Sequence, residues 1–324
     1  MTALLEIEDL KVTFNTRHGE VTALDSVSLH VNAGETLGVV GESGCGKSIT
    51  ALAVMGLIPS PPGRIAGGSI RLNGEELTTA SPARLRQIRG AEAAMIFQEP
   101  MTSLNPVFTV GAQIAEAIML HQKVSSDRAM KDAIALLDRV GIPSPDTRAR
   151  DFPHQLSGGM RQRVMIAMAV SCRPKMLIAD EPTTALDVTV QAQIFDLLNE
   201  IQRDFSAAIV LITHDMGAIA EMADRVAVMY AGRVIEAATA DDVLDYPQHP
   251  YARGLIDCIP NIAKTHSALR EIPGVVPPLH QLGAGCAFAA RCAHANDRCL
   301  REKPQLAGHG HHPAACHAVE EARI

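Results

Sequence analysis

The glycine-rich segment at residues 41–48 constrains the fold more than any other part of the chain. It reads Gly41-Glu42-Ser43-Gly44-Cys45-Gly46-Lys47-Ser48 and fits the pattern G-x-x-x-x-G-K-[ST]. A short apolar run at residues 35–40 precedes it, and a nearly all-apolar helical pattern at residues 48–57 follows it. A strand that leads through a glycine loop into a helix is the βα unit of a parallel sheet. The sequence therefore predicts an α/β fold.

The chemistry of this phosphate loop, residues 41–48, suits a nucleoside triphosphate. Its glycines let backbone N–H groups point at phosphate oxygens, and the following helix adds the positive end of its dipole. Lys47 has the length to reach the β and γ phosphates, and the Ser48 hydroxyl can ligate Mg²⁺. We therefore predict that all eight residues of the loop bind ATP.

Further strands and helices alternate along the chain. Apolar patterning predicts strands at residues 5–14, 21–31, 69–73, 93–98, 176–180, 207–213 and 225–230, and helices within residues 110–140 and at residues 189–204. A helical subdomain at about residues 108–172 thus interrupts the α/β core. After about residue 235 prolines, histidines and cysteines become frequent. We predict a nucleotide-binding domain at residues 1–235 and a small cysteine-rich C-terminal extension at residues 236–324.

Two carboxylates follow one of the predicted buried strands. The apolar run ends in Asp180, which is placed to hold Mg²⁺ beside the phosphate loop. Glu181 comes next, beyond the strand end, where its carboxylate can polarise a water for attack on the γ-phosphate. Solvated acids also end ordinary strands, but the phosphate loop in the same chain favours the catalytic interpretation.

A second anion-binding pattern occurs at residues 156–160, where a helix is predicted to begin. It reads Leu156-Ser157-Gly158-Gly159-Met160. A serine and two glycines at a helix N-terminus present a hydroxyl and free N–H groups to an anion. An ordinary capped helix shares this pattern. One phosphate chain does not need two cradles from one subunit, however, so we predict two subunits stacked head to tail, each closing the nucleotide of the other.

The order of these motifs resembles the ABC ATPase family throughout residues 1–235. The resemblance implies an antiparallel β subdomain beside the parallel core, and it gives Gln98 the role of binding Mg²⁺ and contacting the γ-phosphate. It implies that Ala185-Leu186-Asp187 contacts the site of the opposite subunit and that His214 is the switch histidine. The family also stacks an aromatic ring on adenine. Phe14 is the candidate here, although it suits a strand core equally well, and His18 is the other ring nearby.

Longer stretches are similar to the ATPases of dipeptide and oligopeptide importers, most of all to the D-type subunit of dipeptide permeases. They lie at residues 94–106, 153–160 and 249–251. This resemblance implies a second, related ATPase subunit, two transmembrane permeases and an extracytoplasmic peptide-binding protein as partners. It also implies a peripheral location at the cytoplasmic face of the inner membrane. Nickel importers look similar, so the cargo stays open between peptides and another small solute.

Composition and charge limit the alternatives. The formal charge is −7 and no basic run occurs, which argues against an ABC ATPase that acts on nucleic acid. No apolar stretch approaches the roughly 20 residues that a membrane-spanning helix needs. The N-terminal residues lack the basic region of a signal peptide. We therefore expect a chain that stays in the cytoplasm and reaches a membrane by docking.

Four cysteines crowd into the predicted extension: Cys286, Cys292, Cys299 and Cys316. A reducing cytoplasm disfavours disulfides, so the group is a candidate metal site. Four thiolates at irregular spacing can hold a [4Fe–4S] cluster or a tetrahedral zinc ion, and they can also be buried thiols without a ligand. The resemblance implies the cluster, because the tails of these importer ATPases carry such cysteines.

Overall fold

The structure is a computed structural model, and it describes residues 3–17, 19–99, 103–184, 186–258, 271–306 and 311–324. The chain forms two compact units that do not follow chain order. The first unit contains Met1–Leu4, Asn32–Glu35 and Thr79–Leu211, and the second contains Leu5–Val31, Thr36–Thr78 and Ile212–Ile324. The predicted division at residue 235 therefore differs from the units and stays a prediction.

Buried parallel strands and a group of helices make up the first unit. β6 (Ala93–Ile96) pairs in parallel with β7 (Met176–Asp180). β8 (Ala208–Thr213), of which the residues up to Leu211 belong to this unit, lies next to β7. Every residue of these strands is buried, as is typical of parallel strands covered on both faces. The helices are α2 (Pro82–Ile88), α4 (Val110–Gln122), α5 (Ser126–Arg139), α6 (Pro145–Arg148), α7 (Gly158–Val170) and α8 (Val188–Phe205), with a 3-10 turn at Pro153–Gln155.

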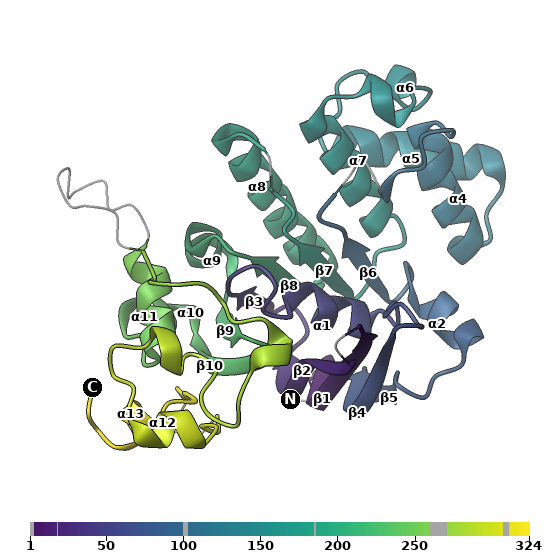
Figure 1. Ribbon diagram of the computed structural model, residues 1–324. Coiled ribbons are helices and arrows are strands. Elements are labelled where there is room, and N and C mark those ends of the chain that lie inside the picture. The colour runs from purple at the N-terminus through teal and green to yellow at the C-terminus, as the bar shows by residue number, and fades with distance from the viewer. Residues whose placement is uncertain (1–2, 18, 100–102, 185, 259–270, 307–310) are drawn as a thin grey trace. The chain divides into compact units, whose positions relative to one another are not determined.

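The spacing of buried residues and the capping residues account for the helices of the first unit. In α5 the buried residues Ala129, Ala133 and Leu137 recur every fourth position, so they share one face of the helix. α5 lies against α4 and α7 (Figure 1), so a buried face on this helix is expected. The side chains of Thr109 and Ser125 accept hydrogen bonds from the first turns of α4 and α5, which fixes where these helices begin.

Two groups of strands make up the β structure of the second unit. A four-stranded antiparallel sheet has the order β2-β1-β4-β5 and is formed by β1 (Leu5–Thr16), β2 (Gly19–Val31), β4 (Gly63–Leu72) and β5 (Glu75–Glu76). In the other group β9 (Arg225–Tyr230) lies between β3 (Thr36–Val40), with which it pairs in parallel, and β10 (Arg233–Thr239), with which it pairs antiparallel. The helices are α1 (Lys47–Val54), α9 (Met216–Met222), α10 (Ala240–Asp245), α11 (Pro250–Asp257), α12 (Asp297–Arg301) and α13 (His317–Glu320), with 3-10 turns at Leu279–Gln281 and Ala289–Arg291.

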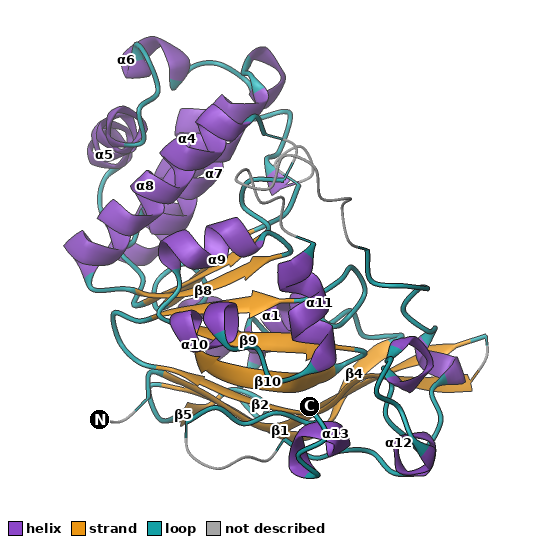
Figure 2. Ribbon diagram, turned by 90° about the vertical axis from the view of Figure 1, so that its left-hand side faces the viewer, coloured by secondary structure: helices purple, strands orange, loops and turns teal. Residues whose placement is uncertain are grey.

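The end of the chain folds onto β10, and α10 packs against β9 and β10 (Figure 2). The backbone N–H of Ala237 donates to Pro313 O at 3.2 Å, and that of Ala315 donates to Ile235 O at 2.7 Å. The Glu236 carboxylate is fully buried between these bonds. The extension is therefore attached to β10 through an antiparallel bridge, between Glu236 and Ala314.

Buried hydrogen bonds of Glu236 and His249 hold the first part of the extension in place. The Glu236 carboxylate accepts the N–H groups of Gln248 at 2.8 Å and His249 at 2.7 Å, and His312 Nε2 lies 2.6 Å from it. The His249 Nδ1 atom accepts the N–H of Tyr251 at 3.0 Å and so caps α11. Burial lowers the pKa of His249 to about 3, which keeps this ring neutral and able to accept that bond.

The predicted elements agree with the observed ones where a continuous apolar run defines a strand. The strands predicted at residues 176–180 and 225–230 have the observed bounds of β7 and β9. The strand expected at residues 69–73 begins earlier, at Gly63. The short helices α2 and α9 were not predicted. Among the described residues, no helix combines the length and hydropathy needed to cross a membrane.

Candidate active site

The phosphate loop joins β3 to α1 in the second unit, and its path depends on glycine. Gly41 has φ 153° and Gly46 has φ 111°, both in the region that other residues avoid. A Cβ atom at Gly41 would lie 2.2 Å from the carbonyl oxygen of Met229, which belongs to β9. A side chain at residue 41 would therefore push the loop away from the strand that supports it.

Lys47 is held by the loop that it completes. Its Nζ atom donates to Gly41 O at 2.6 Å and to Glu42 O at 3.2 Å, and the residue is 5% exposed. These carbonyl oxygens keep the ammonium at the loop, where phosphate oxygens can take their place as acceptors. Burial raises the pKa of the Cys45 thiol, so this side chain stays neutral and adds no negative charge to a phosphate site.

The other predicted site residues of the second unit differ in their exposure. Ser48 is half-buried in the first turn of α1, while Ser43 and Gly44 are exposed. Phe14 is half-buried, and its Cε1 atom would lie 2.6 Å from a Cβ atom at Gly63, so part of the ring packs on β4. His18 lies outside the described residues.

His214 follows β8 directly and is exposed. The Thr213 hydroxyl accepts the N–H of Asp215 at 2.9 Å, and the Asp215 carboxylate accepts the N–H of Gly217 at 2.7 Å. These bonds turn the chain from β8 into α9 at His214. Its contact with a γ-phosphate stays a prediction.

The first unit brings Gln98 and Glu181 together, although 83 positions separate them. The Gln98 Nε2 atom donates to Glu181 Oε2 at 2.9 Å, and the Thr184 hydroxyl donates to the same oxygen at 2.9 Å. Glu181 has φ 47°, a strained value for a residue with a side chain. Asp180, one residue earlier, is the last residue of β7 and is 4% exposed. The strand end therefore holds two carboxylates in different environments, one buried and one oriented by an amide and a hydroxyl.

The second anion-binding pattern opens α7 in the first unit. The Ser157 hydroxyl caps the helix by accepting the N–H of Met160 at 3.3 Å, and Leu156 is buried beneath it. Gly158 is exposed, and a Cβ atom built on it would meet no atom within 4 Å. At Gly159 a Cβ atom would lie 3.1 Å from Val190. Ser157 and Gly158 thus face open space, as a cradle for a second subunit's nucleotide requires.

The Ala-Leu-Asp turn leads into α8. Asp187 caps this helix by accepting the N–H of Val190 at 3.0 Å, and the Leu186 N–H donates to Thr183 O at 3.2 Å. Ala185 lies outside the described residues. The predicted site residues thus belong to both units, and their assembly around one nucleotide stays a prediction.

Three contacts of the predicted site residues were missed by the sequence analysis. Thr184 bonds to Glu181, the Tyr251 hydroxyl accepts the N–H of Glu42 at 2.7 Å, and Arg291 forms an ion pair with Glu42 at 2.6 Å. Tyr251 stood out only within a stretch similar to importer ATPases. No local pattern marks Arg291, because its partner lies 249 positions away.

The four cysteines of the extension lie near one another in the second unit. Burial raises the pKa of Cys286 to about 11, and the neighbouring thiols of Cys299, Cys316 and Cys292 add to this rise. The Cys286 N–H also donates to Cys299 O at 2.7 Å. None of the four forms a disulfide. Within the described residues, however, no three histidine, cysteine or acidic side chains are grouped so that they could hold a metal ion.

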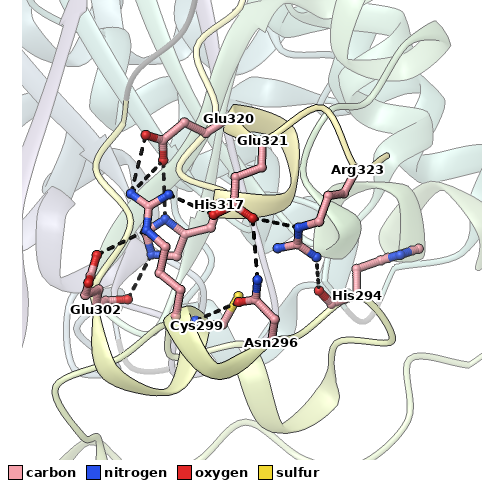
Figure 3. A network of polar contacts seen from close by, with 9 residues as sticks. His294, Asn296, Cys299, Glu302, His317, Glu320, Glu321 and Arg323 are labelled. Atoms are coloured by element: carbon pink, nitrogen blue, oxygen red, sulfur yellow. Dashed lines mark hydrogen bonds and ion pairs between the residues drawn. The ribbon is translucent and has the colours of Figure 1, made fainter.

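A network of charged side chains joins the segments that carry these cysteines (Figure 3). Arg298 on α12 bonds to Glu321 at 2.9 Å, and Arg323 bonds to Glu321 at 2.7 Å and to His294 O at 2.8 Å. The His317 ring lies 3.0 Å from Glu302 O (Figure 3). These bonds link the segment before α12, the end of α12 and the residues of and after α13, so they hold the cysteine-bearing segments in place.

Comparison with known proteins identifies the chain. A family model described as "ABC transporter" matches residues 24–184, and one described as "Oligopeptide/dipeptide transporter, C-terminal region" matches residues 235–299. The oligopeptide transport ATP-binding protein OppD of Salmonella typhimurium is 51% identical, over 93% of this chain and 89% of its own length. The chain belongs to the ABC transporter family. The resemblance seen in its motifs is thereby confirmed, and so is its activity as an ATPase.

Other relatives of this ABC protein agree in length and kind. The dipeptide transport ATP-binding protein DppD of Escherichia coli is 50% identical, over 94% of this chain and 93% of its own length. The Bacillus subtilis oligopeptide transport ATP-binding protein AppD is 49% identical, over 95% of this chain and 94% of its own length.

Solved structures confirm the α/β fold of this ABC protein. The ATP-binding cassette MJ0796, in a dimeric post-hydrolysis state with ADP and Pi, has a TM-score of 0.66 at 24% identity and covers 73% of this chain and 98% of its own. The structure of cbiO1 from Clostridium perfringens has a TM-score of 0.63 at 27% identity and covers 76% of this chain and 92% of its own.

Proposed function

We propose that this ABC ATPase powers the import of dipeptides or oligopeptides across the cytoplasmic membrane. The observation that carries the proposal is the match of residues 235–299 to the C-terminal region of oligopeptide/dipeptide transporters, together with about 50% identity to ATP-binding proteins of such transporters. The catalytic motifs alone specify ATP chemistry and leave the cargo open, so the cargo rests on these relatives.

The site residues divide the ATPase reaction between binding and hydrolysis. The phosphate loop holds the triphosphate through its N–H groups and Lys47, and Phe14 stacks on the adenine. The Ser48 hydroxyl, the Gln98 amide and the buried Asp180 carboxylate are the hard oxygen ligands that suit Mg²⁺, which neutralises charge on the phosphates. Glu181, oriented by Gln98 and Thr184, takes a proton from the attacking water. His214 contacts the γ-phosphate.

A second ATPase subunit completes the site. Residues 156–160 present an exposed serine hydroxyl and helix N–H groups that suit the triphosphate of a partner. Leu186 and Asp187, with Ala185, would lie beside that partner's site. We propose that this partner is a different, related chain.

The first unit exposes apolar side chains suited to docking on a membrane subunit. Val107 is 70% exposed and Phe108 is 54% exposed, and both follow Gln98 in the chain. Large exposed apolar side chains that lie together mark interaction surfaces. We propose that this segment meets one of two transmembrane permeases, which places the ATPase peripherally at the cytoplasmic face of the inner membrane. An extracytoplasmic peptide-binding protein then delivers cargo to the permeases.

Peptide cargo is tested by uptake in cells. Cells that lack this gene but keep its permease partners should fail to accumulate a radiolabelled dipeptide, and the intact gene should restore uptake. Nickel uptake measured in the same cells distinguishes a peptide importer from a related nickel importer. Restored nickel uptake without any change in dipeptide uptake would contradict the proposed cargo. If deletion of the gene changed neither dipeptide nor nickel uptake but impaired a process that involves nucleic acid, a non-transport ATPase would be favoured.

We also propose that Cys286, Cys292, Cys299 and Cys316 hold a [4Fe–4S] cluster, with zinc as the alternative occupant. The contributions of Cys292, Cys299 and Cys316 to the raised pKa of Cys286 indicate that the four thiols lie near one another, as the ligands of one cluster must. The donor set suits either metal, and a small extension with little core would gain stability from one.

Purified without oxygen, the protein is expected to be brown, with broad visible absorbance and about four irons per chain. Replacing Cys299 with Ser should remove most of this iron, while replacing Cys172, which lies outside the extension, should not. A colourless protein that contains zinc would show that zinc, and not the cluster, occupies the site. A colourless protein free of both metals would end the proposal of a metal site.

A further inference from the structure

Within the part of the chain that the structure describes, hydrogen bonds join the C-terminal extension to Glu42 of the phosphate loop. Arg291 donates from Nη1 to Glu42 Oε2 at 2.6 Å and from Nη2 to Glu42 Oε1 at 3.0 Å. This is the two-pronged arrangement in which guanidinium and carboxylate bind most strongly. Both residues belong to the second unit, although 249 positions separate them.

The extension itself holds Arg291 in position. Its Nε atom donates to Pro273 O at 2.8 Å, and its Nη2 atom donates to Ile272 O at 3.3 Å. The side chain is 4% exposed, whereas that of Glu42 is 31% exposed. A buried guanidinium with this many bonds has little freedom to move, so the position of Glu42 follows that of the extension.

A second contact holds the backbone of the same loop residue. The Glu42 N–H donates to the Tyr251 hydroxyl at 2.7 Å. Tyr251 is fully buried, and its ring packs against Tyr230 and Phe288 with centroid distances of 4.7 Å and 5.5 Å. The extension thus fixes both the side chain and the N–H of Glu42.

The third polar group of Glu42 shapes the phosphate loop from inside. Its carbonyl oxygen accepts the N–H of Cys45 at 3.3 Å and the Nζ of Lys47 at 3.2 Å. Glu42 therefore stands between the extension on one side and the phosphate-binding lysine on the other. A shift of Glu42 would move the acceptor that locates Lys47 and would change the turn at Cys45.

We propose that Arg291 and Tyr251 are positioning residues for ATP, which set the shape of the phosphate loop by holding Glu42. The extension is then part of the nucleotide-binding apparatus, beyond any role in metal binding or partner recognition. The inference rests on ATP binding by this chain and not on its cargo. A preformed loop lowers the cost of ordering when ATP binds, because the N–H groups already face the phosphates.

The test measures the Kd of ATP for the full chain by equilibrium binding of a fluorescent ATP analogue in the presence of Mg²⁺. Arg291→Lys keeps the charge but loses the fork, and Glu42→Gln keeps the shape but loses the charge. We expect each to raise the Kd about tenfold, as the loss of a charge-assisted pair can do. Tyr251→Phe, which removes only the hydroxyl, should raise the Kd a few-fold.

Arg298→Ala is the matched control within the extension. Arg298 bonds to Glu302, Glu320 and Glu321 and has no contact with the phosphate loop among the bonds described. This variant should lower the melting temperature of the chain without nucleotide while leaving the Kd of ATP unchanged. It therefore separates general loosening of the extension from the loss of the contact with Glu42.

A double-mutant cycle decides whether Arg291 acts through Glu42. If it does, the Kd of ATP for the variant that carries both Glu42→Ala and Arg291→Ala is no higher than the Kd of whichever single variant binds ATP more weakly. Effects that multiply would overturn the proposal, and so would a Kd within twofold of the parent in Arg291→Lys, Glu42→Gln and Tyr251→Phe. These three conservative variants give the answer even if Arg291→Ala does not fold. In the assembled transporter the same changes should raise KM for ATP with little effect on kcat, since they alter binding rather than the water-activating carboxylate.

Discussion

Replacing Glu181 with Gln is expected to lower ATP turnover by roughly 10²- to 10⁴-fold, the usual contribution of a general base. The amide matches the carboxylate in shape, and its oxygen can still accept the bonds from Gln98 and Thr184, which lie 2.9 Å from the present oxygen. It cannot take a proton from water. ATP binding should therefore persist, and the two-subunit sandwich should accumulate in its ATP-bound form.

The measurement is phosphate release by the assembled transporter, with bound ATP quantified in parallel. Glu200→Gln is a suitable control, because Glu200 is an exposed acid on α8 away from the strand end. It should keep the parental rate. A Glu181→Gln protein that hydrolyses ATP at near-parental rate would show that another group activates the water.

Replacing Gly158 with Ala is expected to abolish most ATPase activity of the assembled transporter without disturbing the fold. An added Cβ atom would meet nothing within 4 Å in the free chain, so folding should be unaffected. In the sandwich the same methyl group would stand between the α7 N-terminus and the partner's phosphates. Displacing a reacting group by about 1 Å can cost roughly 10²-fold in rate, and we expect a loss of at least that size.

The prediction is checked by comparing two preparations of the same variant. The isolated chain should bind ATP with parental Kd, because its own phosphate loop is intact, whereas the assembled transporter should lose turnover. Gly67→Ala is the matched control, since a Cβ atom at Gly67 also meets nothing within 4 Å and this residue lies in β4. Parental ATPase activity in the assembled Gly158→Ala transporter would contradict head-to-tail closure by this motif.

The sequence predicts the buried strands and the ATP-binding motifs of this protein better than it predicts the contacts of the C-terminal extension. β7 and β9 are continuous apolar runs, so local patterning fixes their bounds. The contact between Gln98 and Glu181 could not be read from local patterns, because nothing in the sequence near either residue shows that the strands before them are neighbours. The role of Gln98 toward Mg²⁺ stays a prediction.

What could not be predicted depends on contacts between distant parts of the chain. β10 extends across residue 235 because it pairs antiparallel with β9 from Arg233 to Thr239. Its further bonds to Pro313 and Ala315 join residues far apart in the chain and leave no mark on the local pattern. The role of Arg291 could not be predicted either, because it depends on the ion pair with Glu42, which lies 249 positions away. The short helices α2 and α9 are too brief for periodicity to identify them.

The continuity of β10 across residue 235 also bears on how such proteins can evolve. A recombination event that exchanged tails at this point would divide β10 and leave β9 with only part of its antiparallel partner. The new tail would have to supply matching hydrogen-bonding groups for the strand and a guanidinium for Glu42 at the same time. We therefore expect this cassette to accept a tail from a relative only where that tail brings both of these features.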